Sequence, residues 1–148
     1  MTKRHCIVIT LLTLVLCSCG NEINVEHPVP NAPVECTINI MRDAPLLDII
    51  GNSFVIDRPL NTNQYIGYSG LVIVHGLDDM FYAFDLCCPH EHQRNIRVKC
   101  DMISAHCDQC GTTYDIGFGT GIPSKGPSQF PLRRYTVTPS GYNLHITQ

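Results

Sequence analysis

The sequence predicts an all-β domain, and three observations lead to this prediction. The apolar positions beyond residue 35 fall in short runs that alternate by two, which is the period of a strand. These runs are separated by turn-forming Gly, Pro, Asn and Asp, as in GLDD, GFGTG and PSG. No long window carries a helical apolar stripe, and only APLLDIIG, residues 44–51, is compatible with one or two helical turns.

The predicted strands lie throughout the chain beyond residue 35. The segment GTTYD, residues 111–115, also has the pattern of a strand. We find no internal repeat, and residues 36–148 are enough for one domain with its own core. The other predicted strands are residues 36–40, 70–74, 80–86, 96–100, 102–106, 134–138 and 142–146.

The N-terminus has the features of a lipoprotein signal peptide. The basic stretch KRH precedes Ile7–Leu16, an apolar run too short to cross a bilayer as a permanent helix. The following LCSC resembles a bacterial lipobox, which implies that residues 1–18 are removed and that Cys19 carries the lipid. We therefore expect a protein of the bacterial cell envelope, bound to a membrane through a lipid anchor. The alternative is a secretory signal cut elsewhere, with Cys19 an ordinary thiol.

Residues 19–35 are predicted to be the lipidated N-terminus and an extended linker. Residues 20–35 contain three prolines and no periodic apolar pattern, so we expect them to separate the domain from the membrane.

The charge pattern gives no sign of a nucleic-acid partner. The chain has 10 basic and 13 acidic residues, and loss of Lys3 and Arg4 with the signal peptide leaves 8 against 13, a net charge of −5. No basic stripe is present, and the aromatic residues are not interleaved with Lys or Arg.

Four soft donor residues lie in two close pairs. Cys88 and His90 are separated by one residue, sixteen residues follow, and Cys107 and Cys110 are separated by two. Thiolates and imidazoles bind iron–sulfur centres and zinc. Two such pairs on two loops, a hairpin length apart, allow a β domain to bring four donors to one metal centre. The spacing therefore predicts a metal site made of these four residues.

This pattern resembles the Rieske iron–sulfur domain, whose motif is C-x-H, a spacer of similar length and then C-x-x-H-G. The matching segments here are CPH and CDQCGTTYD, and GIPSKGPSQFPLRRYTV is similar to the family's Gly-Pro loop and final hairpin. The likeness covers roughly residues 36–148. It implies an antiparallel β-sandwich with a small cluster-binding subdomain inserted as two loops. It also implies a 2Fe–2S cluster that exchanges single electrons with a redox partner protein.

One ligand position departs from the family pattern, because Cys110 stands where the second histidine is expected. The resemblance then implies Cys88 and Cys107 on one iron, with His90 and Cys110 on the other. A third thiolate adds a negative charge that opposes reduction. We expect a potential below the usual Rieske range of about −150 to +300 mV. With one imidazole, the potential is also expected to depend less on pH.

Two alternatives need no iron. Three cysteines and one histidine are an ordinary closed zinc site. In an oxidising compartment, the six cysteines beyond Cys19 could instead form disulfides, which would leave a non-redox envelope lipoprotein with a Rieske-like fold. The signal favours these alternatives, because exported Rieske proteins generally cross the membrane folded, by the twin-arginine route, and this signal reads KRH.

Adjacent Cys87 and Cys88 point to opposite faces of an extended segment, so at most one of them can face the metal. The spacing from His90 selects Cys88. We expect Cys87 to pack inward or to pair with Cys36 or Cys100.

The other histidines are weaker candidates. His92 shares a face with His90 in an extended segment and is a substitute ligand or, as we favour, a solvated neighbour. His106 is expected at the surface and His75 at a strand end. A thioredoxin-like role for Cys107 and Cys110 would need a helix after the motif, whereas GTTYD predicts a strand.

The resemblance implies further contacts around the cluster. A loop at Gly126 and Pro127 would shield it from water, and backbone amides near Gly111 and Thr112 would donate to the sulfurs, as would the Tyr114 hydroxyl.

No catalytic motif is present, since the chain lacks a Ser–His–Asp order, a phosphate loop and a zinc-protease helix. The chain also has no room for the mononuclear iron domain of an oxygenase. We therefore expect an electron-transfer module of an oxidoreductase system, without catalytic activity of its own.

Overall fold

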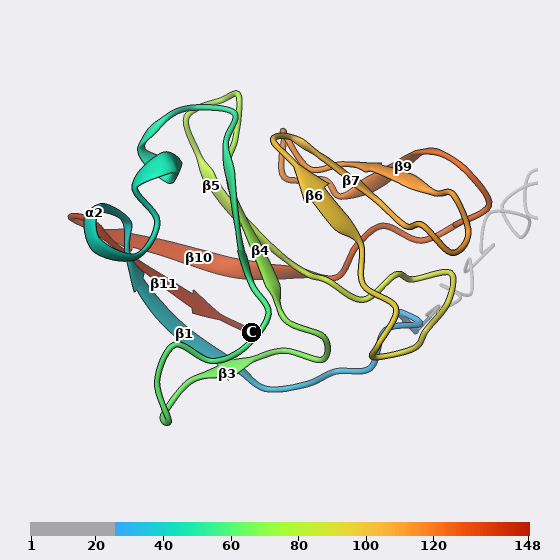
Figure 1. The fold of residues 1–148 in the computed structure, drawn as a ribbon, viewed down its shortest axis with the longest axis horizontal. Coiled ribbons are helices and arrows are strands. Elements are labelled where there is room, and N and C mark those ends of the chain that lie inside the picture. Colours follow the sequence, from blue (N-terminus) through green and yellow to red (C-terminus); the bar gives the residue numbers. More distant parts are fainter. Residues whose placement is uncertain (1–25) are drawn as a thin grey trace, which may run out of the picture.

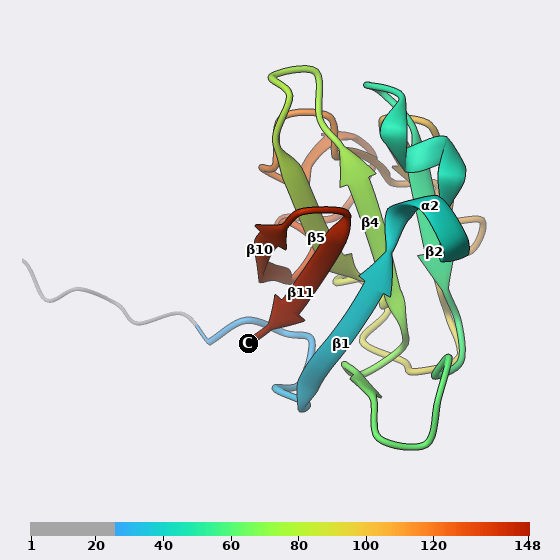
Figure 2. The ribbon, with the colours of Figure 1, turned by 90° about the vertical axis from the view of Figure 1, so that its left-hand side faces the viewer.

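A computed structural model describes residues 26–148, which form an almost entirely β structure (Figure 1). Seven antiparallel strands make the larger sheet, in the order β2-β4-β5-β10-β11-β1-β3. The sheet curls, so that β1 and β11 are opposite β2 and β4 (Figure 2). The strands are β1 (Val34–Asn39), β2 (Ser53–Ile56), β3 (Tyr65–Ile66), β4 (Leu71–His75), β5 (Phe81–Asp85), β10 (Arg134–Ser140) and β11 (Asn143–Thr147).

A smaller four-stranded sheet, with the order β6-β7-β8-β9, lies to one side of the larger one (Figure 1). All of its strands come from the chain between β5 and β10, so it is an insertion into the larger sheet. The prediction of an all-β fold with a small inserted subdomain is confirmed. The strands are β6 (Lys99–Asp101), β7 (Ser104–His106), β8 (Thr113–Asp115) and β9 (Ile122–Lys125).

Helical structure among residues 26–148 is limited to two single turns, α2 (Ile40–Asp43) and the 3-10 helix η1 (Pro45–Asp48). The Asn39 side chain accepts a hydrogen bond from the Arg42 N–H at 3.1 Å and so caps α2. Helix η1 lies within the predicted helical segment 44–51. Strands β2, β3 and β9 are not predicted from the sequence, because β3 has only two residues and the segments SFVI of β2 and IPSK of β9 do not alternate between apolar and polar positions.

Strand β4 is buried on both faces, and its two faces belong to two different cores. Leu71 and Ile73 pack in the first core, inside the curled sheet, whereas Val72 and Val74 pack in the second core, between the two sheets. This placement explains the uninterrupted apolar run GLVIV, which a strand with one wet face would not have. The second core also contains Cys88 and Cys107 and therefore reaches the predicted metal site.

The predicted boundary between linker and domain, at residue 36, lies inside β1. Upstream of β1, Val29 is fully buried, and its carbonyl oxygen accepts from the Arg133 guanidinium at 2.6 and 3.0 Å. Residues 29–35 therefore belong to the folded domain. The prolines of this segment led to the prediction of a linker. Proline removes a backbone donor, but it does not prevent an extended segment from packing against the domain.

The predicted signal peptide, residues 1–18, and the predicted lipidation site Cys19 lie outside the described residues. In residues 26–148, no helix has the length and apolar character needed to span a membrane.

Candidate metal centre

The first predicted ligand loop begins where β5 ends, and a buried carboxylate fixes its start. Asp85 accepts hydrogen bonds from the backbone N–H groups of Tyr68, Ser69 and Cys87 at 2.7, 3.1 and 2.8 Å, and from the Tyr135 hydroxyl at 2.9 Å. Burial raises the pKa of the Asp85 carboxyl, and these hydrogen bonds act in the opposite direction. The carboxylate thus accepts hydrogen bonds from backbone N–H groups that have no partner strand at the end of β5.

Cys87 and Cys88 point in different directions, as the sequence predicts. Cys87 is fully buried, and its thiol lies 3.5 Å from the Gln93 carbonyl oxygen, away from the other cysteines. Burial raises the pKa of the Cys87 thiol to about 11. The Cys88 N–H donates to the Ile96 carbonyl at 3.1 Å, which holds the loop closed while the Cys88 side chain enters the second core.

The second ligand loop is a tight turn between β7 and β8. The Cys107 N–H donates to the Thr112 carbonyl at 2.8 Å, and the Gly111 N–H donates to the Cys107 carbonyl at 2.9 Å. Gly111 has a φ of 73°, in the left-handed region that a residue with a Cβ adopts at a cost. This turn brings the side chains of Cys107 and Cys110 to one place.

The two loops bring three thiols together. The Sγ atoms of Cys88, Cys107 and Cys110 all lie within 4.8 Å of one another, and the Sγ atoms of Cys88 and Cys110 are 3.7 Å apart. Cys88 and Cys107 are buried and Cys110 is partly exposed, so the group lies at the edge of the second core. Three converging soft donors in a largely dry setting can bind a soft metal centre.

Two hydroxyl groups contact these thiols. Tyr114, fully buried in β8, places its hydroxyl 3.4 Å from the Cys88 sulfur. The Cys110 thiol donates to the Thr112 hydroxyl oxygen at 3.1 Å. The resemblance implies this role for the Tyr114 hydroxyl, whereas for Thr112 it implies only a contact through the backbone amide.

The thiols differ in acidity. Burial raises the pKa of the Cys107 thiol to about 12. Burial acts in the same sense on Cys110, but hydrogen bonds with Thr112 and with the two neighbouring thiols outweigh it and hold the pKa of Cys110 below its ordinary value. A metal must displace the Cys107 proton, so binding of a metal here is coupled to proton release.

The loop at Gly126 and Pro127 lies against the second ligand loop. A Cβ on Gly126 would lie 2.5 Å from the Thr112 Cα, and Gly126 has a φ of 102°. The Ser128 N–H donates to the Thr112 hydroxyl oxygen at 3.2 Å. The predicted Gly-Pro loop is therefore in contact with the thiol group through Thr112.

His90 does not belong to the thiol group. It is exposed at the tip of the first loop, where His90 and His92 line a shallow pocket of about 250 Å³ with Pro127 and Phe130. His92 is also exposed and has a φ of 56°. The structure thus brings together Cys88, Cys107 and Cys110, three of the four predicted ligands. The fourth, His90, is exposed to solvent on the loop that carries Cys88.

Two further histidines, His75 and His106, lie where the sequence predicts them. His75 ends β4, and its ring nitrogens lie 2.7 Å from the Leu47 carbonyl oxygen and 2.9 Å from an Asp79 carboxylate oxygen. His106 is exposed on β7, with Nε2 3.0 Å from Asp108. Neither ring is directed at the thiols.

None of the six cysteines between residues 26 and 148 forms a disulfide. Cys36 lies in the first core and Cys100 at the edge of the second, and burial raises their pKa values to about 11 and about 12. The expected inward packing of Cys87 is confirmed, and its suggested pairing with Cys36 or Cys100 is absent from this structure.

Asp85 is not among the residues predicted from the sequence, although its carboxylate anchors the first loop. The available signal was a lone acid at the end of an apolar strand, immediately before LCCPH. A charged residue in that position has to find partners when it is buried.

Comparisons with known proteins add little beyond this geometry. No family model matches the chain, and no curated protein matches it. Among solved structures, a ferredoxin from Sphingomonas yanoikuyae B1 is similar, with 20% identity and a TM-score of 0.45 over 68% of this chain and 88% of the ferredoxin. Because the identity and the TM-score are this low, we infer the function from the geometry of the site and not from this similarity.

Proposed function

We propose that this protein is an electron carrier whose 2Fe–2S cluster is held by Cys88, His90, Cys107 and Cys110. The observation that carries the proposal is the convergence of three cysteine sulfurs from two loops of the inserted subdomain. Iron–sulfur clusters are bound by cysteine thiolates, with histidine in place of some of them in Rieske centres.

The donor set suits such a cluster. Cys88 and Cys107 project from the dry interior, and Cys110 is at the solvent side. A centre of two irons needs a fourth donor there, and His90 lies two residues from Cys88 on the same loop. In this proposal the His90 ring turns from solvent toward the thiols when the cluster is bound.

The surroundings support tuning of a redox centre. The Tyr114 hydroxyl and the Thr112 hydroxyl are both within hydrogen-bond distance of ligand sulfurs. Hydrogen bonds to the sulfurs raise the reduction potential of such a centre, because they stabilise its more negative reduced state. The third thiolate has the opposite effect, so we propose a potential below the usual Rieske range.

Further parts of the proposal concern the location and the partner of the protein. The lipobox-like LCSC supports a lipid anchor on Cys19, a location in the bacterial cell envelope and attachment to a membrane. We also propose that the cluster exchanges electrons with a separate redox partner protein and that this domain has no catalysis of its own, and the converging thiols at the edge of the inserted subdomain support the electron-transfer part.

A zinc site is the second candidate, and one distance favours it. In a tetrahedral zinc site with Zn–S bonds of about 2.3 Å, neighbouring sulfurs lie about 3.8 Å apart. The Cys88 and Cys110 sulfurs are 3.7 Å apart. In the 2Fe–2S arrangement these two residues bind different irons and have to lie further from each other.

Elemental analysis of the protein, purified without air, separates these candidates. An electron carrier contains about two irons and two acid-labile sulfides per chain and shows a rhombic EPR signal after dithionite reduction. One zinc and no sulfide would select the second candidate, and a metal-free protein would reject both.

The role of His90 has a matched control in His92. We expect His90→Ala to lose the cluster or to shift the EPR g-values, and His92→Ala to change neither. Equal spectra for both variants would remove His90 from the ligand set.

A further inference from the structure

A second site, away from the thiols, carries three arginines. A pocket of about 510 Å³ opens between the loop that follows β2, the turn before β4 and the distal part of the first ligand loop. Arg58, Arg94 and Arg97 line it, with Asp57 as the only acidic residue in the lining. This concentration of positive charge stands out in a chain with a formal net charge of −3.

None of the three guanidinium groups forms an ion pair within the part of the protein that the structure describes. The four ion pairs within residues 26–148 involve Arg42, Lys99, His75 and His106, and none involves Arg58, Arg94 or Arg97. Arg94 lies over the Tyr68 ring at 5.9 Å from its centroid, a contact that orients the guanidinium and leaves its donors free.

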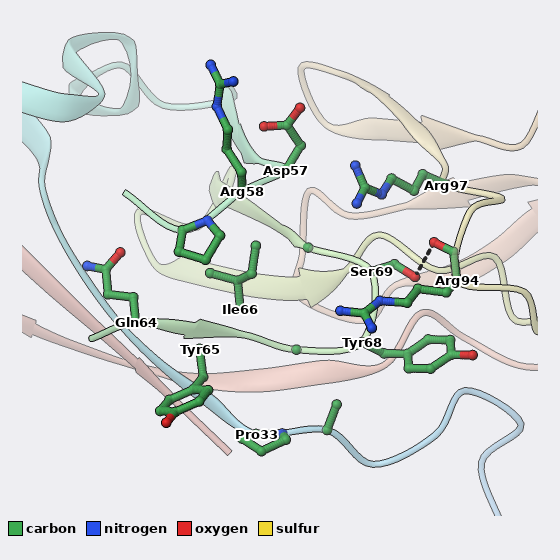
Figure 3. Close-up of a pocket in the computed structure, with 14 residues that line it drawn as sticks. Pro33, Asp57, Arg58, Gln64, Tyr65, Ile66, Tyr68, Ser69, Arg94 and Arg97 are labelled. Atoms are coloured by element: carbon green, nitrogen blue, oxygen red, sulfur yellow. Dashed lines mark hydrogen bonds between the residues drawn. The ribbon is translucent and has the colours of Figure 1, made fainter. Parts of the chain in front are cut away.

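The backbone on which Arg94 and Arg97 stand is fixed on both sides. The buried Ser69 hydroxyl donates to the Arg94 carbonyl at 2.9 Å, and Arg97 forms a β-bridge with Cys87. Figure 3 shows that both side chains extend from the same side toward the middle of the pocket, while Arg58 rises from the other wall beside Asp57. The site is thus partly organised before any ligand arrives.

The rest of the lining suits a small molecule with an apolar body. Ile66, Pro33 and Pro59 contribute apolar surface, and the volume lies in the range of pockets that enclose small organic ligands. Arginine presents paired donors that match carboxylate and phosphate oxygens. We propose that this pocket binds a small organic anion, with its carboxylate or phosphate group on Arg94 and Arg97 and its apolar part on Ile66.

The test is calorimetric titration of the intact protein with isophthalate and with phenyl phosphate, which present the two anionic groups on similar rings. Isophthalamide, which has the shape of isophthalate without its charge, is the ligand control. We expect one-site binding of at least one anion and none of the amide. Absence of binding by both anions, or equal binding of the amide, overturns the proposal.

Variants of the lining residues test whether the anion binds in this pocket. Arg94→Ala with Arg97→Ala is expected to weaken binding about tenfold or more, and Asp57→Asn to strengthen it a few-fold by removing the competing charge. Arg134→Ala removes one positive charge from outside this pocket, at the guanidinium that lies over Tyr82, and is expected to change affinity less than about twofold. An equal loss in Arg134→Ala would indicate diffuse attraction and contradict a built site.

A protein partner is the main competitor for this surface. Binding of hexaglutamate that Arg94→Ala with Arg97→Ala abolishes, with no binding of either small anion, would replace the small ligand by an acidic polypeptide and overturn the proposal. None of these measurements depends on the metal, so their outcome is independent of the proposed electron transfer.

Discussion

The two cores on either side of β4 and β5 differ in what closes them. The first core, inside the curled sheet, is lined by aliphatic side chains such as Ile38, Leu47 and Leu144, together with Cys36 and Tyr135. The second core runs between the two sheets and ends in the three thiols. The first core is thus complete with protein alone, whereas the second ends in a group of atoms that is typical of a metal site.

This difference shows how one β scaffold separates stability from chemistry. The strands around the first core pair over several residues, with five registered pairs between β1 and β11. The strands of the smaller sheet pair over at most three residues each, and two loops provide the thiols. We therefore expect metal to stabilise the second region much more than the first.

Metal removal is expected to give the largest effect. A metal that saturates the thiols about a hundredfold above its dissociation constant adds about 2.7 kcal/mol of stability, which is lost on chelation. We expect amide hydrogen exchange in β7 and β8 to accelerate about a hundredfold, and exchange in β1 and β11 to change little. Exchange that rises equally in both sheets would contradict the division into two regions.

Substitution of Gly126 tests the contact between the Gly-Pro loop and the thiol loop. Gly126→Ala would place a Cβ 2.5 Å from the Thr112 Cα at a φ of 102°, and we expect a loss of about 2 kcal/mol or more in the free energy of unfolding. The control is Gly141→Ala, which has a φ of 59° and no atom within 4 Å, and is expected to cost about 1 kcal/mol. Denaturant unfolding measures both, and equal losses would show that the contact with Thr112 is unimportant.

Asp85 links the two regions, because it accepts from Tyr135 of the first core and from the Cys87 backbone in the first ligand loop. In Asp85→Asn, an amide NH₂ has to face groups that donate, so we expect a loss of about 1–3 kcal/mol in unfolding free energy. Asp101→Asn, at an exposed position in β6, is expected to change stability by less than about 0.5 kcal/mol. If Asp85→Asn is as stable as the control, the carboxylate is not the anchor inferred here.

The smallest effect is expected for Tyr114→Phe, which removes the hydroxyl 3.4 Å from the Cys88 sulfur and keeps the ring in place. Loss of one buried hydrogen bond is expected to cost about 1 kcal/mol of stability. It should also lower the reduction potential of a bound cluster, because a donor to the sulfur favours the reduced state. A spectroelectrochemical titration measures the shift in potential. An unchanged or higher potential would show that the Tyr114 hydroxyl does not donate to a sulfur of the cluster.

The sequence predicts much of this architecture because its signals are local. Alternation by two identifies β1, β10 and β11, short continuous apolar runs identify β4 and β5, and the spacing of Cys88, Cys107 and Cys110 identifies the thiol group. Strand β3 has only two residues, and the segment IPSK of β9 includes a proline and one apolar side chain that is exposed, so neither gives an alternation to detect.

Features that depend on contacts distant in sequence could not be predicted. The partners of Asp85 include Tyr68 and Tyr135, 17 and 50 residues away, and the pocket with Arg58 and Arg94 combines separate loops. The burial of Val29 against Arg133 is a contact of the same kind, over 104 residues. The role of His90 as a ligand remains a prediction, because spacing gives proximity along the chain and does not fix the direction of a ring.

The most direct test of the central claim is the metal content of six single Cys→Ala variants, each checked for folding by circular dichroism. We predict that variants at Cys88, Cys107 and Cys110 lose the metal, and that variants at Cys36, Cys87 and Cys100 retain the wild-type content. Wild-type metal content in any of the first three variants, or loss of metal only in the last three, would contradict the assignment of this thiol group as the metal centre.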